Sequence, residues 1–131
     1  MIFTDTSAIY ALADQADKNH AQAKHIANAL NGQEVLIHNY IIVESVALIQ
    51  HRLGFVQAKK FLEEVSQFRI VWIDAHLHQD AMNYFIKVGR RKVSFVDCVS
   101  FTLMRQEDIK KAFAFDQDFT NAGFELVSYH A

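Results

Sequence analysis

The chain has 131 residues, of which 51% are hydrophobic and 21% are charged, and this composition excludes a disordered or collagen-like protein. Its 15 acidic residues and 13 Lys or Arg residues give a net charge of −2, which excludes an overall positive field that would attract nucleic acid or an anionic membrane. The length fits one domain that spans residues 1–131.

The sequence shows no sign of export or of membrane insertion. The single cysteine, Cys98, cannot form an internal disulfide, and the first acid of the chain already stands at Asp5, without the basic start of a signal peptide. The most apolar run, residues 35–49, contains His38, Asn39 and Glu44 and is too short and too polar to cross a bilayer. We therefore expect a soluble cytoplasmic protein with no membrane partner.

Short apolar runs alternate with longer helical segments along the chain. Hydrophobic patterns predict strands at 2–4, 35–37, 70–73, 112–115 and 126–127, and helices at 7–12, 17–30, 56–68, 75–88 and 94–107, with one more that is capped by Asn39 and runs to about Leu53. Strands that alternate with helices pair in parallel through right-handed crossovers. The sequence thus predicts an α/β fold: a parallel-stranded α/β/α sandwich of about five short strands with helices on both faces.

Two acids follow predicted strands, and such sheets bind ligands outside the carboxyl ends of their strands. Asp5 comes directly after the first predicted strand, and Asp116 directly after the fourth. Each has a purely structural alternative, because Asp5 is also a good helix N-cap and Asp116 a common turn residue. Asp118, two residues further on, is expected to be exposed or to support the site from outside.

Two further acids lie in predicted helices. Glu44 stands among apolar residues in the segment 40–49, where a buried carboxylate needs a partner, unless it is the one position of that helix facing solvent. Asp97 completes the pattern Ser94-x-x-Asp97, a capping box that would explain it on structural grounds alone.

Taken together, the predicted fold brings Asp5, Glu44, Asp97 and Asp116 to the carboxyl edge of the sheet. Carboxylates this close repel one another and require a cation between them. Because all four offer oxygen ligands, Mg²⁺ or Mn²⁺ suits them better than Zn²⁺. Acid clusters with such cations typically hydrolyse phosphodiesters, so the sequence favours a metal-dependent nuclease.

The ordered set of motifs Ile2-Phe3-Thr4-Asp5-Thr6-Ser7, Val43-Glu44, Ser94-Phe95-Val96-Asp97 and Phe115-Asp116-Gln117-Asp118 resembles the PIN-domain ribonucleases. The similarity is greatest to the VapC-type toxins of toxin–antitoxin pairs, and it extends over the whole chain.

The resemblance implies an endoribonuclease toxin that uses Mg²⁺ or Mn²⁺, with a small antitoxin and a second copy of the chain as partners. It implies that Asp5, Glu44, Asp97 and Asp116 are the metal-binding acids, with Glu44 binding directly or through water. It also implies a supporting hydroxyl from Thr6 or Ser7. The family often has threonine two positions before the last acid, where this chain has Ala114. This departure leaves open whether Asp116 or Asp118 is the last acid of the set.

Other residues have more than one interpretation. Arg90, Arg91 and Lys92 precede the helix of Asp97 and would bind RNA phosphates there, or form an ordinary solvated loop. Cys98 is interpreted as a small core residue rather than a nucleophile. The aromatic residues Tyr10, Tyr40, Phe61 and Phe68 belong to the core or to a dimer face.

Two rival functions remain compatible with the sequence. One is a housekeeping RNA-processing nuclease of the same family without an antitoxin. The other is a metal-binding, receiver-like signalling module without hydrolytic activity. Asp74 after the third predicted strand fits a receiver phosphoacceptor, but Asp5 lacks the adjacent acid that a receiver needs.

Overall fold

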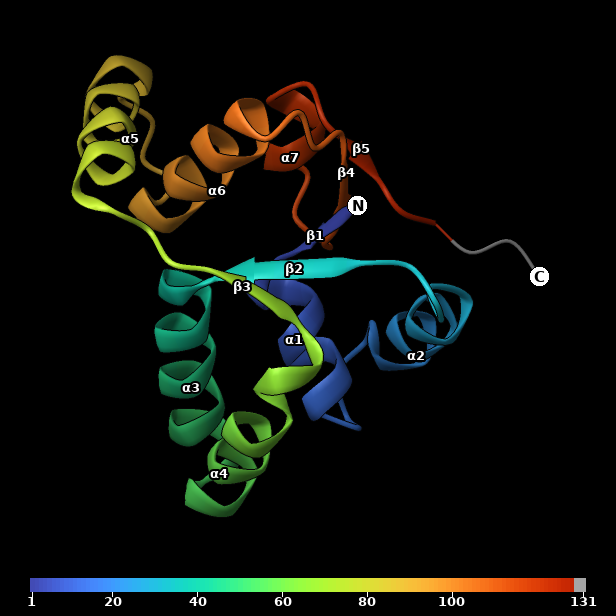
Figure 1. Cartoon of the computed structure of the whole chain (residues 1–131). Coiled ribbons are helices and arrows are strands. Elements are labelled where there is room, and N and C mark those ends of the chain that lie inside the picture. The colour runs from blue at the N-terminus through green and yellow to red at the C-terminus, as the bar shows by residue number, and fades with distance from the viewer. Residues whose placement is uncertain (129–131) are drawn as a thin grey trace.

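The chain folds into strands and helices arranged around one parallel sheet (Figure 1). The structure is a computed structural model, and it describes residues 1–128. Its elements are, in chain order, β1 (Ile2–Thr4), α1 (Thr6–Ala13), α2 (His20–Ala29), β2 (Val35–His38), α3 (Asn39–Leu53), α4 (Phe55–Glu64), the 3₁₀ helix η1 (Val65–Gln67), β3 (Arg69–Val71), α5 (Ala75–Val88), α6 (Phe95–Gln106), β4 (Lys111–Phe113), α7 (Asp118–Asn121) and β5 (Glu125–Leu126).

The five strands stand in the order β3-β2-β1-β4-β5, and every neighbouring pair is parallel. The first strand therefore lies in the middle of the sheet, where Ile2 pairs with Val35 on one side and with Lys111 on the other. The predicted parallel α/β fold is confirmed. All five carboxyl ends face the same edge, which is where the sequence predicts the acids.

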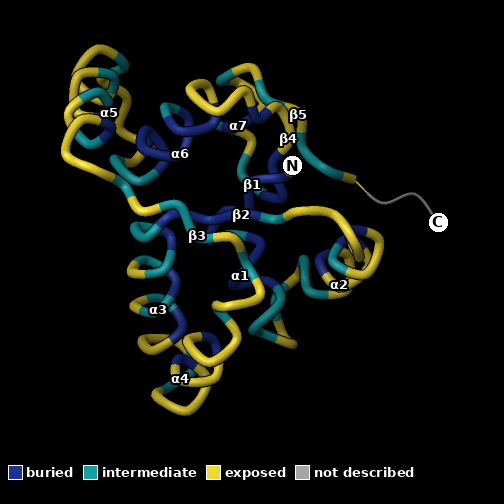
Figure 2. The backbone as a smooth tube through the Cα atoms, in the orientation of Figure 1, coloured by how far each residue is buried: buried dark blue, intermediate teal, exposed yellow. Residues whose placement is uncertain are grey.

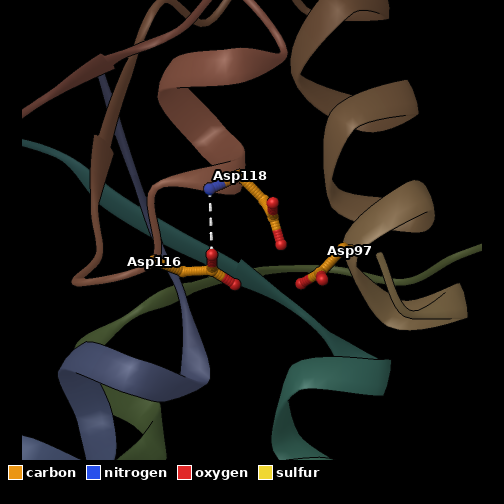
Figure 3. A group of neighbouring side chains, drawn as sticks. All are labelled: Asp97, Asp116 and Asp118. Carbon is orange, nitrogen blue, oxygen red and sulfur yellow. Dashed lines mark hydrogen bonds between the residues drawn. The ribbon is translucent and has the colours of Figure 1, made fainter. Parts of the chain in front are cut away.

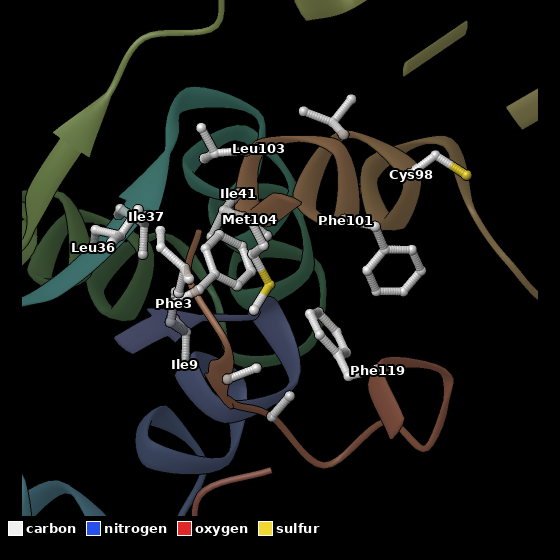
Figure 4. Close-up of a cluster of buried hydrophobic side chains, with 14 of the residues drawn as sticks. Phe3, Ile9, Leu36, Ile37, Ile41, Cys98, Phe101, Leu103, Met104 and Phe119 are labelled. Atoms are coloured by element: carbon white, nitrogen blue, oxygen red, sulfur yellow. The ribbon is translucent and has the colours of Figure 1, made fainter. Parts of the chain in front are cut away.

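Helices cover both faces of the sheet, with α5, α6 and α7 on one side and α1 to α4 on the other (Figure 1). Alternation along β1 divides its side chains between the two sides. Ile2 packs with Ala8 and Ile26 of α1 and α2, whereas Phe3 stacks on Phe119 of α7 with ring centroids 6.1 Å apart. Buried positions line the inner sides of these helices (Figure 2). The cluster around Phe3 includes Phe101 and Leu103 of α6 as well as Ile9 of α1 and Ile41 of α3 (Figure 4).

The fourth strand ends two residues earlier in the structure than the sequence predicts. Residues 112–115 were expected to be extended, but β4 ends at Phe113. The backbone N–H of Phe115 donates to Ser7 Oγ at 3.0 Å instead of to a neighbouring strand. Asp116 therefore does not follow the strand directly and stands at the end of a short connecting segment.

Two predicted helices are also shorter in the structure. Residues 17–19 form a turn ahead of α2, in which an Asp17 carboxylate oxygen accepts from the Asn19 N–H at 2.9 Å. The expected helix 56–68 is α4 followed by η1. The α4 residue Phe61 and the α1 residue Tyr10 are buried, whereas Tyr40 and Phe68 pack against the core with part of their surface exposed.

Asn39 does not cap α3, so this prediction was wrong. His38 is the N-cap, and its Nδ1 accepts from the N–H groups of Tyr40 and Ile41, both at 3.2 Å. Asn39 is instead the first helical residue, and its side-chain oxygen accepts from the Ile73 N–H at 2.6 Å. It thereby ties α3 to the segment that follows β3. Among the described residues, no helix combines the length and hydropathy needed to cross a membrane.

Candidate metal centre

Asp5 stands at the carboxyl end of the central strand β1 and is both a helix cap and a buried acid. One of its carboxylate oxygens accepts from the Ser7 N–H at 3.1 Å and from the Ser7 hydroxyl at 2.7 Å. Burial raises the pKa of Asp5, and these hydrogen bonds from Ser7 only partly oppose it. Because the Ser7 oxygen also accepts from Phe115, it joins Asp5 to the segment that leads to Asp116.

Glu44 lies in α3 and is half-buried beside the start of α1. Burial raises the pKa of Glu44; a hydrogen bond from Thr6 lowers it, and the charge of Asp5 raises it further. The Thr6 oxygen in turn accepts from the buried Ser45 hydroxyl at 3.2 Å. The two hydroxyl groups thus have different partners: that of Thr6 binds Glu44, and that of Ser7 binds Asp5.

Asp97 occupies the first turn of α6 and completes a capping box with Ser94. Its carboxylate accepts from the Ser94 N–H at 3.1 Å, and the Ser94 hydroxyl oxygen accepts from the Asp97 N–H at 3.0 Å. The capping interpretation is therefore right, yet it leaves the carboxylate buried next to other acids. Burial, the charge of Asp5 and then that of Asp116 raise the pKa of Asp97 to about 7, against the hydrogen bonds from Ser94.

Asp116 and Asp118 approach Asp97 from the segment after β4 (Figure 3). One ligand oxygen from each of these three acids lies within 4.8 Å of the other two. The Asp118 N–H donates to an Asp116 carboxylate oxygen at 2.9 Å and so fixes the turn that brings both acids forward. Asp118, which the sequence suggested would support the site from outside, stands directly in this group.

The acids influence one another electrostatically. Burial raises the pKa of Asp116, a backbone hydrogen bond from Asp118 lowers it, and the charges of Asp118 and Asp5 raise it again. Asp5 likewise raises the pKa values of Glu44 and Asp97. A nearby positive charge would stabilise the ionised form of these carboxylates. An all-oxygen donor set of this spacing fits a hard divalent cation. The donor chemistry of the site therefore suits Mg²⁺ or Mn²⁺.

The other residues that the sequence analysis singled out lie outside the acid group. Arg90, Arg91 and Lys92 are exposed on the loop between α5 and α6, just before the helix that carries Asp97. Cys98 is fully buried, and burial raises the pKa of its thiol to about 11, which confirms the core interpretation. Asp74 caps α5 by accepting from the Leu77 N–H at 2.8 Å.

Sequence reasoning missed two features near the site. The Asp116-x-Asp118 spacing at the start of a short helix was the signal that could have placed both carboxylates in one group. His38 gave no comparable signal, because a histidine at the end of an apolar strand does not reveal its partners. In the structure it is buried and binds Ser100, which lies on α6 one turn after Asp97.

The chain matches the family model of the PIN domain over residues 2–125. It belongs to the PIN-domain family. The 23S rRNA-specific endonuclease VapC20 of Mycobacterium tuberculosis is 34% identical over 129 residues, which make up 97% of this chain and 98% of that protein. Because this similarity covers nearly the full length of both chains, the protein is a VapC-type PIN ribonuclease. PIN ribonucleases are metal-dependent hydrolases.

Solved structures agree with this assignment. The crystal structure of M. tuberculosis VapC20, described as a sarcin–ricin loop cleaving toxin, has a TM-score of 0.90 at 33% identity and covers 98% of this chain and 100% of its own. FitAcB from Neisseria gonorrhoeae has a TM-score of 0.69 at 16% identity and covers 98% of this PIN domain and 97% of its own chain. PAE2754 from Pyrobaculum aerophilum has a TM-score of 0.62 at 21% identity, with coverages of 96% and 88%. The last two show only that the fold is shared. The receiver-like alternative is contradicted by the match to the PIN-domain family model.

Proposed function

We propose that this VapC-type PIN ribonuclease is an endonuclease that cleaves ribosomal RNA and requires Mg²⁺ or Mn²⁺. The observation that carries the proposal is the group formed by Asp97, Asp116 and Asp118, whose ligand oxygens lie within 4.8 Å of one another. Raised pKa values at Asp97 and Asp116 support it, because holding crowded, partly buried carboxylates in the charged form is unfavourable and a bound cation offsets this cost.

The acids have distinct roles in this proposal. Asp97 and Asp116 hold the cation together with Asp5, and Asp118 either binds it as well or orients Asp116 through its backbone N–H. Glu44 binds the cation directly or through a water molecule, and it orients the water that attacks the phosphate. Ser7 and Thr6 fix the directions of the Asp5 and Glu44 carboxylates. When bound, the cation supplies the positive charge that activates water and balances charge developing on the scissile phosphate.

The substrate is proposed from the relatives and from the charge of the loop before α6. VapC20 is named as specific for 23S rRNA, and at 34% identity we infer an rRNA substrate for this chain too. Arg90, Arg91 and Lys92 are exposed close to the start of the helix that carries Asp97. They would bind RNA phosphates and position the strand without reading its sequence.

We further infer a cytoplasmic toxin that consists of one domain over residues 1–131, is inhibited by a small antitoxin and pairs with a second copy. The similarity to VapC20, whose structure is named as that of a toxin, supports the inference of an antitoxin. The exposed apolar side chains of Trp72, Phe85 and Ile86, on and just before α5, support a protein partner, because single soluble chains rarely leave such groups uncovered.

The direct test is cleavage of purified 23S rRNA, with transfer RNA and messenger RNA as comparison substrates, in Mg²⁺, Mn²⁺ or EDTA. We expect cleavage of the rRNA with either cation and none in EDTA. Asp97→Asn should lower the rate by about 100-fold or more, as when one charge-stabilising group leaves an active site. The amide oxygen can still accept from the N–H of the N-cap residue Ser94, so the circular dichroism spectrum should not change.

Asp108→Asn is the matched control for Asp97→Asn. Asp108 is exposed after the far end of α6 and has a φ of 53°, a conformation that asparagine also adopts readily. The substitution removes one negative charge at a position far from the acid group, so it should leave cleavage unchanged. Full activity in EDTA, or equal loss in the two variants, would overturn the proposed metal-dependent mechanism.

A further inference from the structure

His38 is a fully buried histidine at the carboxyl end of β2, next to the central strand. Its exposed fraction is 0%, and its ring stacks on Phe3 with centroids 5.6 Å apart and planes 24° apart. Burial lowers the pKa of His38 to about 3, so the ring is neutral. His38 is not one of the residues assigned to the cation. Its hydrogen bonds indicate its role.

The contacts of His38 fix its tautomer. Nδ1 accepts from the N–H groups of Tyr40 and Ile41 at 3.2 Å each, so it carries no proton. The single ring proton therefore sits on Nε2, which lies 2.9 Å from Ser100 Oγ and donates to it. The Ser100 hydroxyl in turn donates to the Val96 carbonyl oxygen at 3.1 Å. The hydrogen bonds run in one direction from the ring to α6.

This chain of hydrogen bonds joins the two helices that carry acids of the site. His38 caps the first turn of α3, and Glu44 lies one turn further along that helix. Ser100 and Val96 belong to α6, and Val96 immediately precedes Asp97. The bond between His38 and Ser100 spans 62 positions of sequence and is fully buried. It connects the junction of β2 and α3 directly to α6.

We propose that His38 and Ser100 form a positioning pair that sets the spacing of α3 and α6, and with it the distance between Glu44 and Asp97. This inference rests on the proposed function, because it assigns the pair to the same cation site. Neither residue touches the reacting atoms; both act through the acids on their helices. Small displacements of groups around a reacting centre are costly, and residues that orient metal ligands typically contribute about 10–100-fold in affinity or rate.

Two substitutions cut the tie in different ways. Ser100→Ala removes the acceptor of the His38 proton, keeps the cap on α3 and favours helix in α6. His38→Asn keeps a good N-cap for α3, but the shorter side chain does not reach Ser100. Thr102→Ala is the matched control, since the Thr102 hydroxyl donates to the Cys98 carbonyl oxygen at 2.7 Å and so stays within α6.

The experiment measures kcat and KM for rRNA cleavage and, separately, the apparent Kd for Mn²⁺ from the dependence of Tm on Mn²⁺ concentration. We expect Ser100→Ala and His38→Asn to lower kcat by about 10–100-fold and to weaken Mn²⁺ binding, with the KM for RNA nearly unchanged. The double variant should be no worse than the more damaging single variant, because both cut one tie. Thr102→Ala should stay within about twofold of wild type in every constant.

The outcomes separate this inference from the proposed function. If both single variants remain folded and keep wild-type kcat and Mn²⁺ affinity while only Tm falls, the pair is an ordinary core contact and the inference is overturned. If wild type binds Mn²⁺ but cleaves no RNA, the proposed function fails and the Mn²⁺ titration still decides the role of the pair. Wild type that binds no Mn²⁺ contradicts both.

Discussion

Asp97 shows that a structural role and a site role belong to the same side chain. It completes the capping box of α6 with Ser94, and its carboxylate also lies beside Asp116 and Asp118. The same is true of Asp5, which caps α1. A local sequence motif indicates the cap because the cap is made within a few residues. The site depends on residues far apart in sequence, so it appears only when the sheet is assembled.

The raised pKa of Asp97 predicts how stability depends on pH in the absence of metal. Its pKa is about 7 in the folded protein against an ordinary value of 3.8. Between these values the folded state binds more protons than the unfolded state, so the free energy of unfolding falls as pH rises. Asp97→Asn should flatten this fall in urea unfolding measured in EDTA. Asp5, Glu44 and Asp116 leave a residual slope of the same sign, since burial raises their pKa values too.

Asp108→Asn serves again as the control and should retain the wild-type slope. A slope that is identical in Asp97→Asn and in wild type would mean that Asp97 ionises in the folded state as it does in the unfolded chain. The electrostatic description of the site would then be wrong.

At the scale of elements, the sequence predicted what depends on local pattern and missed what depends on distant partners. The five strands and their parallel pairing follow from short apolar runs that alternate with helices. The helix expected over 75–88 matches α5, which Gly89 ends in a left-handed conformation. The end of β4 could not be predicted, because Phe115 leaves the sheet to bind Ser7, a residue 108 positions away. His38 replaced Asn39 as the cap of α3 for a similar reason: Asn39 has a distant partner in Ile73.

The exposed loop between α5 and α6 is expected to bind RNA through its three adjacent basic residues. Changing Arg90, Arg91 and Lys92 to Ala should raise KM for RNA and leave kcat nearly unchanged, because these residues bind phosphates and not the reacting atoms. The slope of log KM against log salt should flatten by about 2, as expected when three phosphate contacts on a single strand are lost.

The double variant Lys110→Ala and Lys111→Ala controls for the loss of positive charge as such. Both lysines are exposed at the amino end of β4, at the sheet edge opposite to the acids. Their replacement should leave the salt slope at its wild-type value. A loop variant that behaves like this control would return Arg90, Arg91 and Lys92 to the interpretation of a solvated loop.

At the scale of the whole molecule, the parallel sheet explains why acids from four distant segments meet. Asp5 follows the central strand β1, and Asp116 and Asp118 follow its neighbour β4. Asp97 lies in the first turn of α6, and Glu44 lies in the second turn of α3. These two helices pack on opposite faces of the sheet (Figure 1). This arrangement concentrates negative charge at one edge, which costs stability unless a cation is bound. We therefore expect the same acids to be needed for cleavage and to lower the stability of the metal-free protein.

The most direct test of this account is the Tm of wild type and Asp116→Asn with EDTA and with saturating Mn²⁺. A cation that binds only the folded state at about 100 times its Kd stabilises it by about 2.7 kcal/mol, and each kcal/mol moves Tm by roughly 3–5 °C for a domain of this size. Wild type should show this rise, whereas Asp116→Asn should have an equal or higher Tm in EDTA and respond little to Mn²⁺. A wild-type Tm that Mn²⁺ does not raise, or a variant that keeps the full rise, would contradict the claim that these acids form one cation site.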